Sequence, residues 1–307
     1  MTRDIFASLG GIAFALLLAP FLRSIINRTK ARISGRRGAP LLQPYFSLAR
    51  LLRKGAVYSS TTTWIFRAGP VAGLVTVFGA ICLLPFGGGP ALFRFEGDFL
   101  LLTYLLAVGR FFTILAALDT GSSFEGMGAN REAFFSALSE PTLLLGLAGL
   151  GAVTGSLSLT DIYGRIGASV FLEANMPALI FILAAFMIVF LSENARIPVD
   201  DPTTHLELTM IHEAMILDHC GIDLAFIEFA GALKLWTLGL LITGLIFPVR
   251  FGVFWLDSLV SLFSLATLAV CIGIVESSMA RLKMGRVPQL LSIAFVMSTL
   301  WIMWVVK

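Results

Sequence analysis

The chain has few charged residues for its length. Only 13% of its 307 residues are Asp, Glu, Lys or Arg, whereas soluble domains carry about 25%. A hydrophobic fraction of 57% accompanies this scarcity of charge. The combination excludes an ordinary water-soluble domain and indicates a membrane protein.

The chain also has few cysteines and lacks the short motifs of catalysis and phosphate binding. Cys82, Cys220 and Cys271 are scattered and form no CxxC pair, which excludes a thiolate-bound iron–sulfur or zinc cluster and gives no disulfide framework. No nucleophile elbow, P-loop or dinucleotide fingerprint is present. No internal repeat supports an inverted-repeat transporter. We therefore expect no cofactor in this chain and any electron carrier in another subunit.

Long continuous apolar runs fill most of the chain. A membrane-spanning helix needs roughly 20 apolar residues, and about eight runs approach that length. They cover residues 5–26, 68–86, 98–118, 134–158, 174–192, 223–247, 252–275 and 288–305. A barrel would show short alternating strands instead. The sequence therefore predicts an all-α polytopic integral membrane protein, a single transmembrane domain over 1–307 with about eight spans.

The basic residues predict which loops face the cytoplasm. Most of the 22 lysines and arginines fall in the loops 27–63, 119–133, 193–222 and 276–287. These four loops face the cytoplasm if the N-terminus starts outside. The positive-inside rule then puts both termini outside and these four loops in the cytoplasm. The net charge of +3 reflects this topology and is no evidence for nucleic-acid binding.

The first basic loop contains an amphipathic stretch after Pro44. Apolar Tyr45, Leu48, Leu51 and Leu52 fall on one helical face there and basic residues on the other, the pattern of a helix at a membrane interface or under a docked partner. An ordinary positive-inside loop would explain the charge but not the apolar stripe. The residues expected to dock a partner are Arg36, Arg37, Arg50, Arg53, Lys54, Asp201 and His205.

Residues 193–228 form an acid-rich segment between two apolar runs, and they hold all three histidines. His205, His212 and His219 are spaced by seven, whereas metal-binding histidines on a helix favour a spacing of four. We therefore expect the histidines to contact a partner subunit or other side chains and not to bind a metal. A proton relay stays open, because free imidazole titrates near pH 6.5.

Several ionisable residues lie inside the predicted spans. Arg110, Glu140, Glu228 and Lys234 are examples, and a charge at the centre of a span costs about 2.5–3.5 kcal/mol. Such residues either form structural ion pairs or line a proton or ion path, and their number on neighbouring spans favours the path. The glycine-bearing segment 119–133 is expected to be a connecting loop that lines a cavity.

Four motifs carry a resemblance that extends over nearly the whole chain. They read RRGAPLLQPYFSLARLLRK, LDTGSSFEGMGANREAFFSALSEP, ENARIPVDDPTTHLEL and ESSMARLKMGRVPQLL, in this order. Together they resemble the respiratory complex I subunit 1 family, and within it the membrane subunit of group 4 nickel–iron hydrogenases of the hydrogenase-4 and formate hydrogenlyase type. The resemblance implies a subunit that joins redox chemistry in a peripheral arm to proton movement in the membrane.

The resemblance also implies partners and a location. The partners are the hydrogenase large and small subunits of the arm and antiporter-like membrane subunits. A nickel–iron centre and iron–sulfur clusters are expected in those partners and none in this chain. The location is the cytoplasmic (inner) membrane of a bacterium or archaeon, and the chain itself is expected to be a non-catalytic subunit of the oxidoreductase complex.

Individual positions match the family motifs, and some depart from them. Arg131 and Glu140 match an arginine and a glutamate nine residues apart, where the glutamate belongs to a buried acidic channel. Residues 193–200 match the loop that walls the quinone chamber of complex I. Thr203, Thr204 and His205 stand where complex I carries several glutamates. These departures weigh against quinone binding and favour the hydrogenase branch.

The leading hypothesis is an energy-coupling membrane subunit that translocates protons or sodium ions. Its expected ion path consists of Glu140, Glu193, Asp200, Glu207, Asp218, Glu228 and Lys234, and its balancing charges are Arg110, Arg131 and Arg196. Two alternatives stay open: a quinone-chamber subunit of complex I, and a passive anchor whose acids only bind partner subunits.

Overall fold

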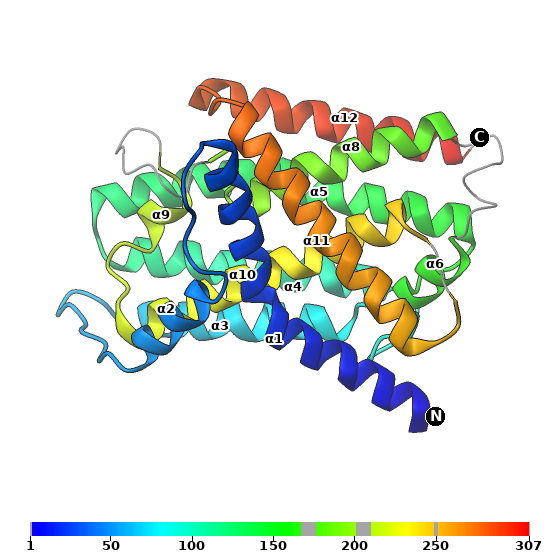
Figure 1. Ribbon diagram of the computed structural model, residues 1–307. Coiled ribbons are helices and arrows are strands. Elements are labelled where there is room, and N and C mark those ends of the chain that lie inside the picture. Colours follow the sequence, from blue (N-terminus) through cyan, green and yellow to red (C-terminus); the bar gives the residue numbers. More distant parts are fainter. Residues whose placement is uncertain (1, 167–175, 201–209, 249–250, 307) are drawn as a thin grey trace.

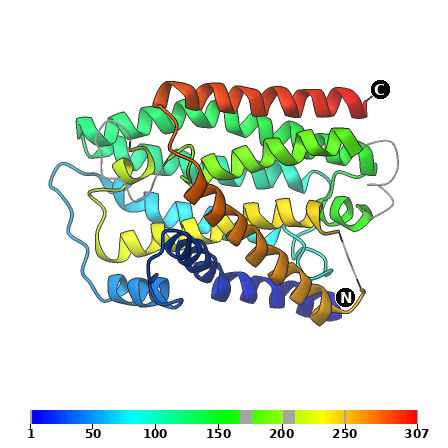
Figure 2. The same cartoon turned by 45° about the horizontal axis from the view of Figure 1, so that its top comes forward.

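The protein is a bundle of long helices, most of which run along one common direction, while the helices Thr2–Ile33 and Phe254–Ser278 cross it obliquely (Figures 1 and 2). The computed structural model describes residues 2–166, 176–200, 210–248 and 251–306. Within these ranges every regular element is helical. The helices are α1 Thr2–Ile33, α2 Gln43–Leu52, α3 Trp64–Cys82, α4 Asp98–Asp119, α5 Ser123–Thr154, α6 Leu159–Arg165, α8 Met176–Glu193, α9 His212–Met215, α10 Gly221–Ile246, α11 Phe254–Ser278, η1 Met284–Arg286 and α12 Val287–Val305.

The long helices confirm the predicted fold class. Seven of them in the described part of the chain are long and apolar enough to cross a membrane: α1, α3, α4, α5, α10, α11 and α12 together with η1. The eighth expected span, 174–192, falls on α8, whose described side chains from Leu179 to Glu193 form a shorter apolar helix. The chain is a multi-pass, all-α membrane protein.

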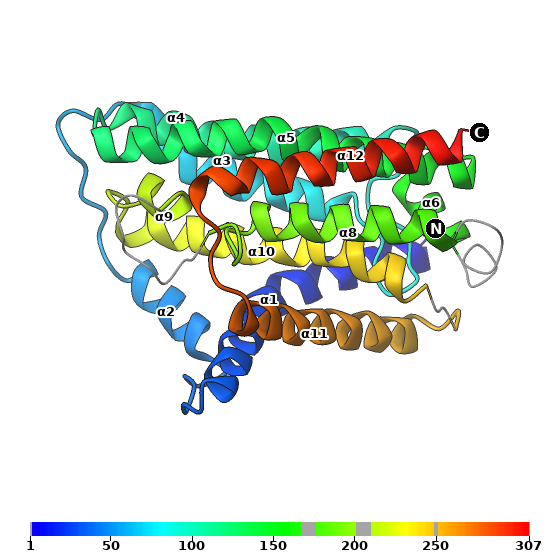
Figure 3. The same ribbon diagram turned by 90° about the horizontal axis from the view of Figure 1, so that it is seen from above.

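The two ends of the bundle differ in what they carry. α1 begins and α12 ends at one end, which also holds α6 and the segment 83–97 (Figure 1). We call this the terminal end. The other end, the loop end, carries α2 and α9 (Figures 1 and 3). The first and last long helices therefore have their outer ends on the same side of the bundle, and the orientation of that side relative to the cytoplasm stays a prediction.

α10 is the central helix of the bundle. Two thirds of its most apolar window is buried, against less than half for every other span. It packs against α1, α3, α8 and α11, and its side chains Leu233 and Trp236 lie in the largest hydrophobic core. An ionisable residue on α10, such as Lys234, is therefore held among other helices.

The prediction of a connecting loop over 119–133 is wrong beyond Gly121. The turn is completed within three residues, at Gly121 with φ +71°, and α5 begins at Ser123. Gly128 lies inside this helix. A Cβ there would come within 2.9 Å of the Ala214 Cβ and the Ile211 carbonyl oxygen. The glycine permits close packing of α9 on α5 and does not mark a turn.

The predicted amphipathic helix is present as α2. It begins at Gln43 with Pro44 in its first turn, where the missing N–H has no cost. The hydroxyl of Tyr45 donates to the carbonyl of Leu17, which attaches the helix to α1. None of the α2 residues is buried, so the helix lies on the surface of the loop end.

Candidate functional site

Arg110 of α4 lies at the centre of a group of carboxylates. Its side chain is only 5% exposed. Nη1 lies 2.6 Å from Glu140 Oε1, Nη2 lies 2.5 Å from Glu193 Oε2, and Nε lies 3.5 Å from Glu132 Oε1. Glu132 and Glu140 come from α5 and Glu193 from α8. One buried guanidinium therefore joins three acids from two further helices.

Lys234 of the central helix completes the group. Its Nζ lies 2.8 Å from Glu193 Oε2, and the Ser139 hydroxyl donates to Glu193 Oε1 at 2.7 Å. We call Arg110, Glu132, Glu140, Glu193 and Lys234 the charge cluster. Glu193 is the last residue of α8, so the cluster lies toward the loop end.

The charge cluster has one carboxylate more than it has cations. Three acids face two bases, and like charges this close disfavour full ionisation of all the acids. Glu193 contacts both cations and stays an anion most readily. Glu132 and Glu140 each contact only Arg110 among the cations of the described part. The cluster therefore offers a place for one exchangeable proton on Glu132 or Glu140.

A cavity with room for water lies beside Glu132 of the cluster. It has a volume of about 80 Å³ and is lined by Arg110, Glu132, Lys234 and His212 among others. A buried water needs about 10–15 Å³ of such space, together with polar partners, and this cavity provides both. The Glu140 side chain is 40% exposed. The charge cluster thus borders a cavity at Glu132 and reaches the surface of the chain at Glu140.

Two other predicted residues, Asp200 and Arg196, form ion pairs outside the charge cluster. Asp200 accepts from Arg281 at 2.8 Å and from the backbone N–H of His212 at 3.2 Å. Arg196 Nη1 lies 3.4 Å from Glu276, which also contacts Lys30 at 2.8 Å. We call these two neighbouring groups of ion pairs, made by Lys30, Arg196, Asp200, Glu276 and Arg281, the loop clamp. It fastens residues 196–200 to α1 and α11.

The two remaining path residues that the structure describes, Glu228 and Asp218, form no ion pair with the charge cluster. Glu228 pairs with Arg23. The backbone N–H of Asp218 donates to the buried Glu125 at 3.1 Å. Arg131 was expected to balance charge, and it donates to the Met210 carbonyl at 2.8 Å. Glu207, Asp201 and His205 fall outside the described residues.

The basic residues expected to dock a partner are exposed at the loop end. They are Arg36, Arg37, Arg50, Arg53 and Lys54. All of them precede or follow the surface helix α2 or belong to it. Their exposure leaves them free to contact a partner subunit or lipid headgroups, and their docking role stays a prediction.

Glu132 is a cluster member that sequence reasoning missed. It was assigned to a loop, where its direction could not be argued. On α5 it lies seven residues before Ser139 and eight before Glu140, a spacing that puts all three on one helical face. Continuing the helical period back from Glu140 to Ser123 would have found it.

The two described histidines are neutral, His219 buried and His212 half-buried. The His219 ring stacks on Phe66 with centroids 3.9 Å apart, and His212 lies beside the cluster cavity. Burial lowers the pKa of each to about 4, so both are uncharged at pH 7. No group of three His, Cys, Asp or Glu among the described residues could hold a metal ion.

Burial of His219 predicts a pH dependence of stability. The unfolded state takes up its proton near pH 6.5 and the folded state only near pH 4, so the free energy of unfolding falls as pH drops through this window. We expect the melting temperature of the purified protein to decrease between pH 6.5 and 4. The variant His219→Phe keeps a stacking ring and should show a smaller slope. An unchanged slope would contradict this role of His219.

The sequence of this chain matches a known protein family. A family described as NADH dehydrogenase matches residues 7–306. The chain belongs to this family, that of respiratory complex I subunit 1. The family accounts for the order of the four sequence motifs over nearly the whole chain.

Similar members of the family come from two kinds of complex. Formate hydrogenlyase subunit 4 of Escherichia coli (strain K12) is 29% identical over 283 residues, 89% of each chain. Hydrogenase-4 component C of the same strain is 28% identical and covers 94% of this chain and 92% of its own. An NADH-quinone oxidoreductase subunit of Rubrobacter xylanophilus is 28% identical over 220 residues, 71% of this chain and 65% of its own.

A solved structure shares the fold of this family member. A chain of the membrane-bound sulfane sulfur reductase, an archaeal respiratory membrane complex, matches with a TM-score of 0.82. The two chains are 19% identical, and the match covers 99% of each. The helical arrangement of that chain is therefore found along nearly the whole length of this one.

Proposed function

We propose that this chain is the membrane anchor and energy-coupling subunit of a multi-subunit, membrane-bound oxidoreductase complex of the hydrogenase type. Its task is to link electron transfer in a peripheral arm to the translocation of protons or sodium ions. The similarity to hydrogenase-4 component C and formate hydrogenlyase subunit 4 over most of the chain supports the type of complex. The charge cluster, with Arg110 within 3.5 Å of three carboxylates, is the observation that carries the coupling role.

The proposal includes an orientation and a set of partners. The loop end faces the cytoplasm, both termini lie outside, and the membrane is the cytoplasmic (inner) membrane of a bacterium or archaeon. The arm consists of hydrogenase large and small subunits that hold the nickel–iron centre and iron–sulfur clusters. Antiporter-like subunits lie beside the chain in the membrane. The exposed basic residues around α2 support docking of the arm at the loop end.

The charge cluster would couple by holding or releasing one proton. A negative charge that arrives in the arm near the loop end favours proton uptake by the cluster, because charges interact strongly where water is scarce. Glu193, fixed between Arg110 and Lys234, keeps the two cations in place. Glu132 and Glu140 hold the proton. The carboxyl group then releases the proton into the adjacent cavity, from which it continues along the ion path.

Neutralising Glu140 tests the coupling role. The variant Glu140→Gln leaves two carboxylates and two cations, so the charges balance and the exchangeable proton is lost. We expect the complex to assemble and transfer electrons, while translocation in sealed vesicles falls about tenfold, as for a barrier raised by ~1.4 kcal/mol. The readout is the change of internal pH per electron pair.

The matched control is Glu96→Gln at the terminal end. Glu96 is exposed and accepts a hydrogen bond from the backbone N–H of Leu157 at 3.1 Å. This variant should assemble and translocate as the wild type does. If Glu140→Gln also translocates normally in an intact complex, the chain is a passive anchor.

A groove beside α2 supports the second candidate, a quinone-chamber subunit. It lies between α1, α2 and α10, has a volume of about 360 Å³ and combines Leu48 and Leu51 with Arg23 and Glu228. A quinone would suit this mixture of apolar and polar lining. Dependence of electron transfer on added quinone would support this candidate, and full turnover without quinone would exclude it.

A further inference from the structure

One carboxylate of the charge cluster reaches the outer surface of the bundle at membrane depth. The Glu140 side chain is 40% exposed, and it does not belong to the lining of the cavity beside Glu132. α5 continues beyond Glu140 to Thr154 at the terminal end, roughly 21 Å further along the helix. With Thr154 near the membrane surface, the carboxylate lies inside the hydrocarbon core, which is about 30 Å thick.

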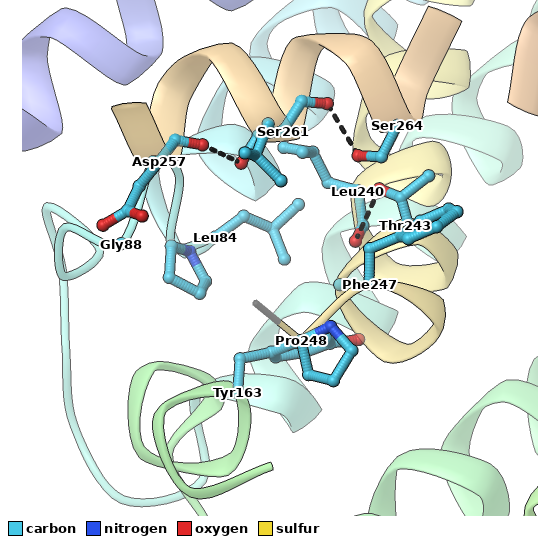
Figure 4. Close-up of a pocket in the computed structure, with 14 residues that line it drawn as sticks. Leu84, Gly88, Tyr163, Leu240, Thr243, Phe247, Pro248, Asp257, Ser261 and Ser264 are labelled. Carbon is cyan, nitrogen blue, oxygen red and sulfur yellow. Dashed lines mark hydrogen bonds between the residues drawn. The ribbon is translucent and has the colours of Figure 1, made fainter. Parts of the chain in front are cut away.

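Other polar groups of the spans find partners within the chain. Around a cavity at the terminal end, the hydroxyls of Ser261 and Ser264 donate to backbone carbonyls of their own helix at 2.9 Å (Figure 4). Glu193 is only 5% exposed and contacts two cations. Glu140 differs, because much of its side chain is uncovered on the outside of the bundle. A charge within a span costs about 2.5–3.5 kcal/mol, so lipid is an unsuitable neighbour for this carboxylate.

The residues that precede Glu140 on the outer face of α5 are small. The helix places Gly126, Asn130, Ala133, Ala137 and Glu140 at intervals of four and three residues, so they share one face. Asn130, Ala133 and Ala137 are exposed. Small side chains let two membrane helices approach closely, and polar side chains then form hydrogen bonds across the contact. We call these five residues the α5 stripe.

The α5 stripe lies at the edge of the bundle. α4 and α5 run side by side along this edge (Figure 3). The helices that pack on α5 in the described part of the chain include α4, α8, α9 and α12, and they leave the stripe uncovered. Phe134, next to Ala133, is 56% exposed. An apolar surface therefore borders the stripe, and Glu140 is the acidic residue within it.

We propose that the α5 stripe is the docking surface for one transmembrane helix of a neighbouring membrane subunit. This helix presents small residues to Ala133 and Ala137 and one hydrogen-bond donor to the Glu140 carboxylate. The donor follows from charge, because the cluster has three acids and two cations and its exposed acid carries a negative charge that lipid does not satisfy. The inference rests on the proposed function for the existence of the neighbouring subunit and specifies where it meets the chain.

Docking at the stripe gives Glu140 a direct contact with the neighbouring subunit. A hydrogen bond to an ionised carboxylate is roughly twice as strong as one between neutral groups. The donor on the neighbouring helix therefore binds Glu140 tightly when the carboxylate is ionised and weakly when it holds a proton. Protonation of Glu140 is felt in the neighbouring subunit by this means.

Photo-crosslinking in the intact complex identifies the occupant of the stripe. Phe134 is replaced by p-benzoylphenylalanine, which has a similar shape, and native membranes are irradiated before the linked peptides are identified by mass spectrometry. We expect a link to a membrane-spanning segment of another subunit that has Ser, Thr, Asn, Gln, His or Lys within one or two helical turns. Links to lipid alone, to a second copy of this chain or to an arm subunit would overturn the proposal.

The matched control carries the same photo-crosslinker at Phe263. This residue is 73% exposed and belongs to α11, which packs mainly against α1 and α10. It should not link to the segment that position 134 finds. A link from both positions to the same segment would overturn the assignment of that segment to the stripe.

A larger side chain tests whether close approach is needed. Ala137→Leu separates the two helices, whereas Ser292→Leu enlarges an exposed residue of α12. Both variant chains should accumulate normally. We expect the amount of the neighbouring subunit per chain in the purified complex to fall about tenfold in Ala137→Leu, the ratio for ~1.4 kcal/mol, and to stay unchanged in Ser292→Leu. A normal amount of neighbour in Ala137→Leu would overturn the docking surface.

The docking surface and the coupling role can fail separately. Glu140→Gln keeps an oxygen that accepts a hydrogen bond, so it removes the titratable group and leaves the stripe in place. Normal translocation by that variant would contradict the coupling role and leave the docking surface intact. A neighbour that stays attached in Ala137→Leu would contradict the docking surface and leave the coupling role intact.

Discussion

The variant Arg110→Met is expected to stop the chain from accumulating in the membrane as an assembled complex. Methionine keeps much of the side-chain volume but leaves Glu132, Glu140 and Glu193 with Lys234 as the remaining cluster cation. Removing one partner of a buried charge group costs about 3–5 kcal/mol, a large part of the about 5–15 kcal/mol that stabilises a folded domain. The measurement is the amount of chain in purified membranes and its melting temperature.

Two further variants show whether this loss comes from charge. Arg94→Met removes an arginine that is 52% exposed and lies 2.6 Å from Asp161, and such surface pairs contribute only about 0–1 kcal/mol. It should accumulate normally. Combining Arg110→Met with Glu193→Gln removes one uncompensated carboxylate and should restore part of the stability. A double variant as unstable as the sum of the single ones would contradict the cluster.

The variant Lys234→Met is expected to abolish translocation while much of the complex still assembles. The cluster would then hold three carboxylates and one cation, so it keeps protons that the wild type releases. We expect a drop of translocation of more than about tenfold. Lys234→Arg keeps the charge and should retain part of the activity. Internal pH change in vesicles, divided by electrons transferred, is the measurement.

Lys30→Met is the control for this prediction. Lys30 and Lys234 are exposed to a similar degree, 22% and 18%, and each lies 2.8 Å from a buried glutamate. Lys30 belongs to the loop clamp and contacts Glu276. Its loss should lower the melting temperature and leave the ratio of translocated protons to electrons unchanged. Equal loss of translocation in both variants would mean that any buried lysine matters and that the cluster is not special.

The spans could be predicted from the sequence because a bilayer imposes a simple length and polarity rule. The apolar runs 98–118 and 288–305 correspond closely to α4 and α12. The rule fails where helices continue past the apolar region. α1 extends to Ile33 and α5 begins at Ser123, since polar residues and glycines are tolerated in helices that pack on other segments. Such packing is tertiary information that one sequence does not display.

The site could be predicted in part. Arg110, Glu140, Glu193 and Lys234 stood out as charges in or beside apolar runs, and the structure brings all four together. The sequence could not separate them from Asp200, which the fold places in the loop clamp with Arg281. Which acid meets which base depends on the order of helices around α10. Neither composition nor spacing specifies that order.

In the proposed coupling, one proton on Glu132 or Glu140 follows the redox state of the arm. Infrared difference spectra of the complex, reduced minus oxidised, measure this directly through the C=O stretching band of a protonated carboxyl group. We expect a band that disappears in Glu132→Gln or Glu140→Gln and persists in Glu228→Gln, whose carboxylate pairs with Arg23 outside the cluster. A band that survives in both cluster variants, or one that vanishes only in Glu228→Gln, would contradict it.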